Sequence, residues 1–136
     1  MNNFNEVADR ALQAMKQRAA ELKVQGVAIV AASEGDRVQS WLSKMLVVDV
    51  FKKVPSPDDP GLNLISVAYS KAAEMADTLR ASGSGVRPPL KGEFGWEGGV
   101  ITRGKAGYLI ASFSGGSGAD DVKISQAGLA ILAAAL

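Results

Sequence analysis

The chain is short, nearly neutral in charge and free of two reactive residue types. It has 136 residues, with 15 Lys and Arg against 14 Asp and Glu, a formal net charge of +1, no Cys and no His. Since a domain typically takes about 150 residues, we expect one domain over residues 1–136. The missing side chains exclude disulfides, thiolate nucleophiles, Ser-His-Asp devices and ordinary zinc sites. The balanced charge argues against a nucleic-acid partner, which requires clustered basic residues.

No targeting or membrane segment is visible in the sequence. Residues 1–20 are interrupted by charged side chains and contain no apolar run of signal-peptide length. No stretch approaches the roughly 20 apolar residues that a membrane-spanning helix needs. We therefore expect a cytoplasmic protein with no membrane partner.

The first predicted element is an amphipathic helix that ends before Gly26. Asn3 and Glu6 have the spacing of a capping box, which predicts the start of the helix. Lys23 in the last turn and Gly26 beyond it are typical of a helix end. Apolar residues recur at helical intervals on one face: Ala8, Ala11, Leu12, Met15, Ala19 and Leu22.

A first hairpin is predicted to follow. The apolar run 27–32 indicates a strand buried on both faces, and residues 38–48 are its expected partner. Residues 49–54 either prolong that second strand or lead into the next loop. Residues 55–61 must form a loop, because their prolines lack the N–H that a sheet ladder needs.

The second half of the chain repeats the pattern of helix and hairpin. Apolar spacing predicts a helix over about 62–81, followed by a long loop rich in glycine. Residues 100–102 and 108–113 are predicted to form the second hairpin. A last helix is expected to begin near Ser117 and to reach the end of the chain.

The order of helix, hairpin, helix, hairpin and helix predicts an α+β fold. Its antiparallel sheet is built from two hairpins and is covered by three main helices. The last helix carries no charge after Lys123 and ends in Ala133-Ala134-Ala135-Leu136. A helix that is apolar on nearly all sides is covered either by its own domain or by another subunit. We favour the second alternative and expect a homo-oligomer.

The most distinctive segment is the glycine-rich turn 114–118 ahead of the last helix. Such a turn can aim backbone N–H groups at an anion, helped by the helix dipole. Alternatively, Ser117 caps the helix while Asp120 and Asp121 satisfy the dipole. We favour capping, because the glycine spacing matches neither a phosphate loop nor a dinucleotide fingerprint.

A second candidate site is the loop that carries Phe94 and Trp96 between glycines. Aromatic side chains on such a loop suit a flat apolar ligand, but they more often anchor the loop to the core, and we favour anchoring. The pairs Asp58-Asp59 and Asp120-Asp121 are interpreted as solvated turns and caps, so no metal site is predicted. No catalytic constellation is visible, and none is assigned.

Several stretches resemble the GlcG-like, or haem-degrading-domain, family. The resemblance is strongest at Gly98-Gly99-Val100-Ile101, over residues 107–117, at Asp121 and over residues 127–130. Residues 68–73 are similar to the family's helix with the pattern A-x-x-K-A-x-T-A. The resemblance implies a profilin-like α+β domain, oligomeric assembly and, in some members, haem or a related tetrapyrrole bound between subunits.

The resemblance also suggests ligand-binding residues. Those carried over are Lys71, Ser114, Gly115, Gly116, Ser117 and Asp121, and the loop adds Phe94 and Trp96. Without His, haem iron would need Met, Tyr, Lys or a carboxylate as ligand, so the cofactor stays open. We expect a non-catalytic domain that binds a small molecule near a subunit contact. The alternatives are a roadblock-like interaction module and an enzyme that uses Lys71 or Asp121 as base.

Overall fold

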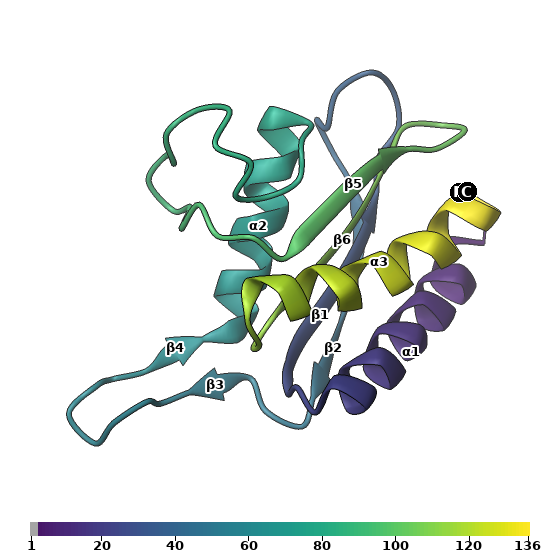
Figure 1. The fold of residues 1–136 in the computed structure, drawn as a ribbon. Helices are drawn as coiled ribbons and strands as arrows, with labels where there is room; N and C mark the ends of the chain where they lie inside the picture. The colour runs from purple at the N-terminus through teal and green to yellow at the C-terminus, as the bar shows by residue number, and fades with distance from the viewer. Residues whose placement is uncertain (1–2) are drawn as a thin grey trace.

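The computed structural model describes residues 3–136, which form an α+β domain in three layers (Figure 1). The helices are α1 (Phe4–Leu22), α2 (Leu64–Thr78) and α3 (Gly118–Ala135). The main sheet has the order β2-β1-β6-β5 and contains β1 (Gly26–Ala32), β2 (Leu42–Val48), β5 (Gly99–Arg103) and β6 (Tyr108–Ser114). All its neighbouring strands are antiparallel. The predicted α+β class and both hairpins are confirmed.

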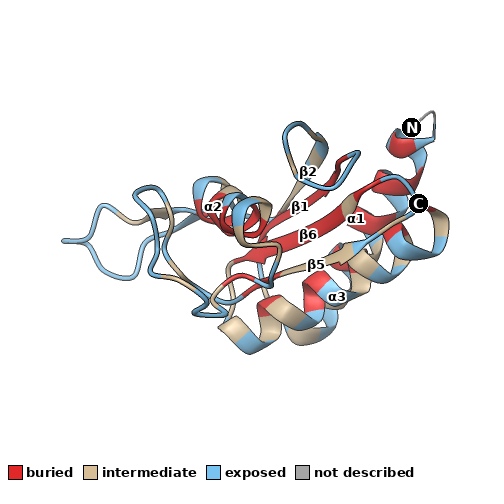
Figure 2. Cartoon of the chain, turned by 90° about the horizontal axis from the view of Figure 1, so that it is seen from above, coloured by how far each residue is buried: buried red, intermediate tan, exposed pale blue. Residues whose placement is uncertain are grey.

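Strand β1 lies inside the sheet and is buried along its whole length (Figure 2). Side chains alternate along a strand, so Ala28 and Val30 pack toward α1 and α3. Val27 and Ile29 pack toward α2 on the other face. Helices on both faces explain why this strand has a continuous apolar run instead of an alternating pattern.

Helix α1 buries the predicted face, but its ends differ from the prediction. The predicted capping box is wrong, because the Asn3 side chain makes no capping hydrogen bond. The helix ends at Leu22, and Lys23 rather than a glycine takes the left-handed conformation, with φ of 59°. The N–H groups of Lys23 and Val24 then donate to the carbonyls of Ala20 and Ala19. These hydrogen bonds satisfy carbonyls that would otherwise lack a partner at the end of the helix.

Helix α3 lies beside α1 on the same face of the sheet (Figure 1). The two helices approach closely at Gly128, where a Cβ would collide with the buried Met15 side chain. Ile124 and Leu132 of α3 are buried, whereas Leu129 and Ile131 are only half-buried. The domain therefore covers one side of α3, and a subunit contact over the remainder stays a prediction.

Helix α2 is shorter than predicted at both ends. It begins after Asn63, whose side chain accepts hydrogen bonds from two first-turn N–H groups, as an N-cap does. It ends at Thr78, because Leu79 takes the left-handed conformation with φ of 56°. None of the helices within residues 3–136 is long and apolar enough to cross a membrane.

Residues 49–63 form an arm that extends away from the body of the domain (Figure 1). Strand β2 ends at Val48, and Asp49 turns the chain with φ of 69°. Strand β3 (Lys52–Lys53) then pairs with β4 (Leu62–Asn63) in a small sheet of its own. Residues 49–54 thus lead into a separate hairpin instead of prolonging β2.

Candidate functional site

A buried ion pair lies where α2 and α3 meet the end of β6. Lys71 Nζ and Asp121 Oδ2 are 3.1 Å apart, and their side chains are 3% and 4% exposed. Lys71 Nζ also donates to the Phe113 carbonyl at 2.8 Å. The second Asp121 oxygen accepts from the Gly116 N–H at 2.9 Å. The pair thereby joins the helix on one face of the sheet to the helix on the other.

Gly98 permits this arrangement because the chain passes directly over the ion pair there. A Cβ at Gly98 would collide with Lys71 Nζ and would lie 2.8 Å from the Phe113 carbonyl oxygen. The residue also has φ of +140°, a backbone conformation that L side chains rarely adopt. The Gly98 carbonyl in turn accepts from the buried Ser125 hydroxyl of α3. Glycine at position 98 is therefore required by both space and backbone conformation.

Burial shifts both groups of the ion pair toward their neutral forms. Loss of solvation is the largest influence on each: it lowers the pKa of Lys71 and raises the pKa of Asp121. The attraction between the two groups opposes both shifts. The Lys71 amine is therefore easier to deprotonate than an exposed lysine, and the Asp121 carboxyl is easier to protonate than an exposed aspartate.

Side chains of the turn and of α3 already form hydrogen bonds with part of the backbone of the glycine-rich turn and the start of α3. The Ser117 hydroxyl accepts from the Asp120 N–H at 3.1 Å, as the favoured interpretation predicts. Asp121 already holds the Gly116 N–H. The N–H groups of Gly118 and Ala119 belong to the first turn of α3. N–H groups in the first turn of a helix have no carbonyl acceptor within that helix. Both residues border the cavity described next.

A cavity of about 560 Å³ lies beside the ion pair. Ligand sites commonly have volumes of about 300–1,000 Å³. Six of the eight predicted site residues line it: Lys71, Trp96, Ser114, Gly115, Gly116 and Asp121. Ser117 instead borders a neighbouring cavity of about 810 Å³ on the arm side of the turn. Phe94 lines neither of these two cavities.

Eight further residues line the cavity and were not selected from the sequence, and four of them carry side chains larger than a methyl group: Lys53, Leu62, Leu64 and Glu97. The first three come from the arm and the start of α2. These segments are distant from the turn in the sequence and lie next to it only in the folded chain. The resemblance is weakest over residues 33–63, so it gave no signal there. Glu97 belongs to the same candidate loop as Phe94 and Trp96 but is not among the selected site residues.

The aromatic residues of the long loop do not anchor it to the core, so that prediction is wrong. Phe94 and Trp96 are 40% and 45% exposed. Their rings stack on each other instead, with centroids 4.5 Å apart and an interplanar angle of 29°. This aromatic pair leaves Trp96 at the wall of the cavity. Exposed aromatic surface at a cavity is well suited to contact with a planar ligand.

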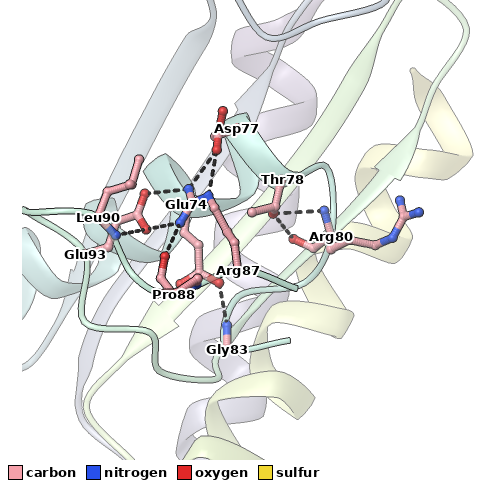
Figure 3. Close-up of polar contacts among 9 residues, drawn as sticks. All are labelled: Glu74, Asp77, Thr78, Arg80, Gly83, Arg87, Pro88, Leu90 and Glu93. Carbon is pink, nitrogen blue, oxygen red and sulfur yellow. Dashed lines mark hydrogen bonds and ion pairs between the residues drawn. The ribbon is translucent and has the colours of Figure 1, made fainter. Parts of the chain in front are cut away.

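The loop is held to α2 by hydrogen bonds and ion pairs (Figure 3). Arg87 donates to both carboxylate oxygens of Glu93 at 2.7 and 3.0 Å, and to Asp77 of α2 at 2.8 Å. The guanidinium lowers the pKa of the Glu93 carboxyl. Glu74, also on α2, accepts from the Gly83 N–H at 2.7 Å. We call Arg87, Asp77 and Glu93 the Arg87 cluster.

The residues around the cavity do not fit ligation of haem iron. Of the four ligand types left by the absence of His and Cys, Tyr and Met are those with precedents in haem proteins. None of the residues that line the cavity is a Tyr or a Met. Met15 and Met75 are buried in the core. Within residues 3–136, no three His, Cys, Asp or Glu residues gather where they could hold a metal ion.

No family model matches the chain, and no curated protein sequence matches it. Membership of the GlcG-like family therefore stays a prediction that depends on the motifs described above.

The Arg87 cluster is expected to restrain the loop that carries Trp96. In Arg87→Met, the Leu90 N–H, which donates to Glu93 in the wild type, should exchange faster with deuterium. In a Trp41→Phe background, where Trp96 is the remaining tryptophan, acrylamide should also quench the fluorescence more strongly. High salt should shift the wild type slightly in the same direction, because it screens the exposed Asp77 carboxylate more than the half-buried Arg87 and Glu93. Arg80→Met is the matched control, since the Arg80 guanidinium donates only to the neighbouring Leu79 carbonyl. Equal behaviour of the two variants would contradict this role.

Lys71→Met should destabilise the fold, because it leaves the Asp121 carboxylate buried without its cation. Removing one partner of a buried pair costs about 3–5 kcal/mol. The folded wild type binds fewer protons than the unfolded chain between the lowered pKa of Lys71 and its ordinary value of 10.5. Its free energy of unfolding should therefore rise with pH across that window, and Lys71→Met should lose the rise.

Urea unfolding over a pH series measures both effects of Lys71→Met. Lys53→Met is the matched control, because it removes the same charge from an exposed lysine at the cavity. An unfolding free energy of Lys71→Met equal to that of Lys53→Met at neutral pH would show that the buried pair does not stabilise the fold.

Proposed function

We propose that this chain is a small-molecule-binding domain of the GlcG-like type and that it acts by binding rather than by turnover. One observation carries the proposal. Six of the eight residues selected from the sequence line one cavity, although they come from α2, the long loop, β6 and the start of α3. Such convergence of separate segments on a cavity of ligand size is typical of a binding site.

The lining favours a planar ligand that carries an acidic group. Trp96 offers an exposed ring, and Leu62 and Leu64 add apolar surface. Lys53 is suited to an anionic substituent, whereas the Glu97 side chain lies beside Gly118 at the start of α3. A tetrapyrrole has this chemistry, and the residues present would hold it through its ring and acidic groups without ligating a central metal.

A second proposal concerns assembly into a homo-oligomer. Strand β2 forms an edge of the main sheet, so one side of its backbone has no neighbouring strand. Apolar side chains are exposed on this strand and on the adjoining arm: Leu42, Met45, Val50, Phe51 and Val54. An exposed apolar patch next to an open sheet edge favours contact with a second copy of the chain. If this contact is the main role, the chain is an interaction module with a roadblock-like arrangement. The expected cytoplasmic location stays a prediction.

Metal-free protoporphyrin IX and haemin are the probes for the proposed site. Both should bind with similar affinity, because the lining recognises the planar ring and its acidic groups rather than iron. Trp96→Ala should weaken binding by about tenfold, equivalent to about 1.4 kcal/mol of lost aromatic contact. Titration followed by Soret absorbance measures this change.

Leu90→Ala is the matched control for Trp96→Ala, because Leu90 is an exposed apolar residue of the same loop outside the cavity. Binding of neither porphyrin would overturn the planar-ligand proposal. Binding of haemin alone would show that iron ligation, by a lysine or carboxylate of the cavity or by a residue outside it, carries the recognition, and it would overturn recognition through the ring.

Sedimentation velocity tests the proposed assembly. The wild type should sediment as a species larger than the 14.1 kDa monomer. Phe51→Ser combined with Val54→Ser should shift it toward the monomer, because both side chains belong to the exposed patch. Val86→Ser combined with Leu90→Ser removes two equally exposed apolar residues elsewhere and should change nothing. A monomeric wild type would exclude this assembly.

A further inference from the structure

Lys71 is the single buried lysine within residues 3–136, and it lies at the wall of the cavity. A lysine ammonium carries three N–H donors, whereas a neutral lysine amine carries two and has a lone pair. Within the described residues, Lys71 Nζ has two acceptors, the Phe113 carbonyl and Asp121 Oδ2. A neutral amine is therefore fully hydrogen-bonded at this position and still has a lone pair available for reaction.

Burial shifts the protonation of Lys71 in the same direction. Loss of solvation lowers its pKa, and the attraction of Asp121 offsets only part of this effect. Within the described residues, Asp121 is the one charged group paired with Lys71. Glu74, one helical turn along α2, is occupied by the Gly83 N–H. Lys53 and Glu97 line the same cavity and carry opposite charges.

We propose that Lys71 captures an aldehyde or ketone group of the ligand as an imine. The inference rests on the proposed function, because it uses the same cavity, and it specifies a carbonyl compound as the ligand class. A lysine amine that is desolvated in a pocket is the form of lysine that reacts with carbonyl groups. The capture is reversible by water, so it is compatible with a binding protein.

The reaction balances with the groups at the site. The Lys71 Nζ lone pair forms a bond to the carbonyl carbon, and one of the two amine protons moves to the carbonyl oxygen, which gives a carbinolamine. The second amine proton then moves to the hydroxyl, which leaves as water while the C=N bond forms. Asp121, 3.1 Å from Nζ, is placed to accept the proton from nitrogen and to return it to the departing hydroxyl. No oxidant or reductant is required.

The test uses 4-carboxybenzaldehyde, a planar aldehyde with one acidic group, on the full-length wild type at pH 7. Sodium cyanoborohydride reduces the imine and fixes it as a secondary amine, and mass spectrometry of peptides identifies the labelled lysines. We expect labelling at Lys71 to exceed labelling at any exposed lysine. Metal-free protoporphyrin IX should suppress labelling at Lys71 and leave the exposed lysines unaffected.

Two variants keep the test independent of folding. Asp121→Asn retains Lys71 and removes the proton carrier, so at a pH above 10.5, where the amine is neutral with or without Asp121, labelling at Lys71 should slow while circular dichroism confirms the fold. Lys105→Met removes an exposed lysine outside the cavity and should leave labelling at Lys71 unchanged. Labelling confined to exposed lysines would overturn the capture. If protoporphyrin IX still binds in that case, the proposed binding function stands without it.

Discussion

The buried pair of Lys71 and Asp121 is the contact on which the rest of the site depends. The two residues come from helices on opposite faces of the sheet and meet at the end of β6. Their remaining hydrogen bonds hold the Phe113 carbonyl and the Gly116 N–H, which lie on either side of the point where the strand becomes a turn. The pair adds to the hydrogen bond from the Ser112 hydroxyl of β6 to the Ala68 carbonyl of α2, and it reaches the turn itself. The position of the cavity therefore depends in part on one electrostatic contact.

Joining two helices through two buried charges costs the solvation free energy of both groups. Well-packed apolar residues often stabilise a fold as well as a buried ion pair does, or better. Here, Asp121 recovers part of the lost solvation through the Gly116 N–H, and Lys71 recovers part through the Phe113 carbonyl. An apolar pair would satisfy neither backbone group and would remove the only buried amine at the cavity wall. This difference favours a role for the pair in the site as well as in stability.

The sequence predicted the elements whose signals are local. The apolar run of β1 and the Ser117 cap depend on neighbouring residues, and both agree with the structure. The helix ends were less predictable, because Lys23 and Leu79 adopt left-handed conformations that glycine usually takes. Lys71 and Asp121 were each selected as site residues, but their contact spans 50 positions and no local pattern encodes it. The arm was missed for the same reason, since β3 and β4 pair across a proline-rich loop.

One side of α2 connects the site to the loop that borders it. Lys71, Glu74 and Asp77 follow at intervals of three residues, so they project from adjacent turns of the same face. Lys71 meets Asp121, Glu74 holds the Gly83 N–H, and Asp77 holds Arg87. The buried amine and both attachments of the loop therefore move with a single rigid helix. A ligand that contacts Trp96 and Lys71 together would touch two parts of the chain whose relative position α2 already fixes. Such preorganisation reduces the ordering cost of binding.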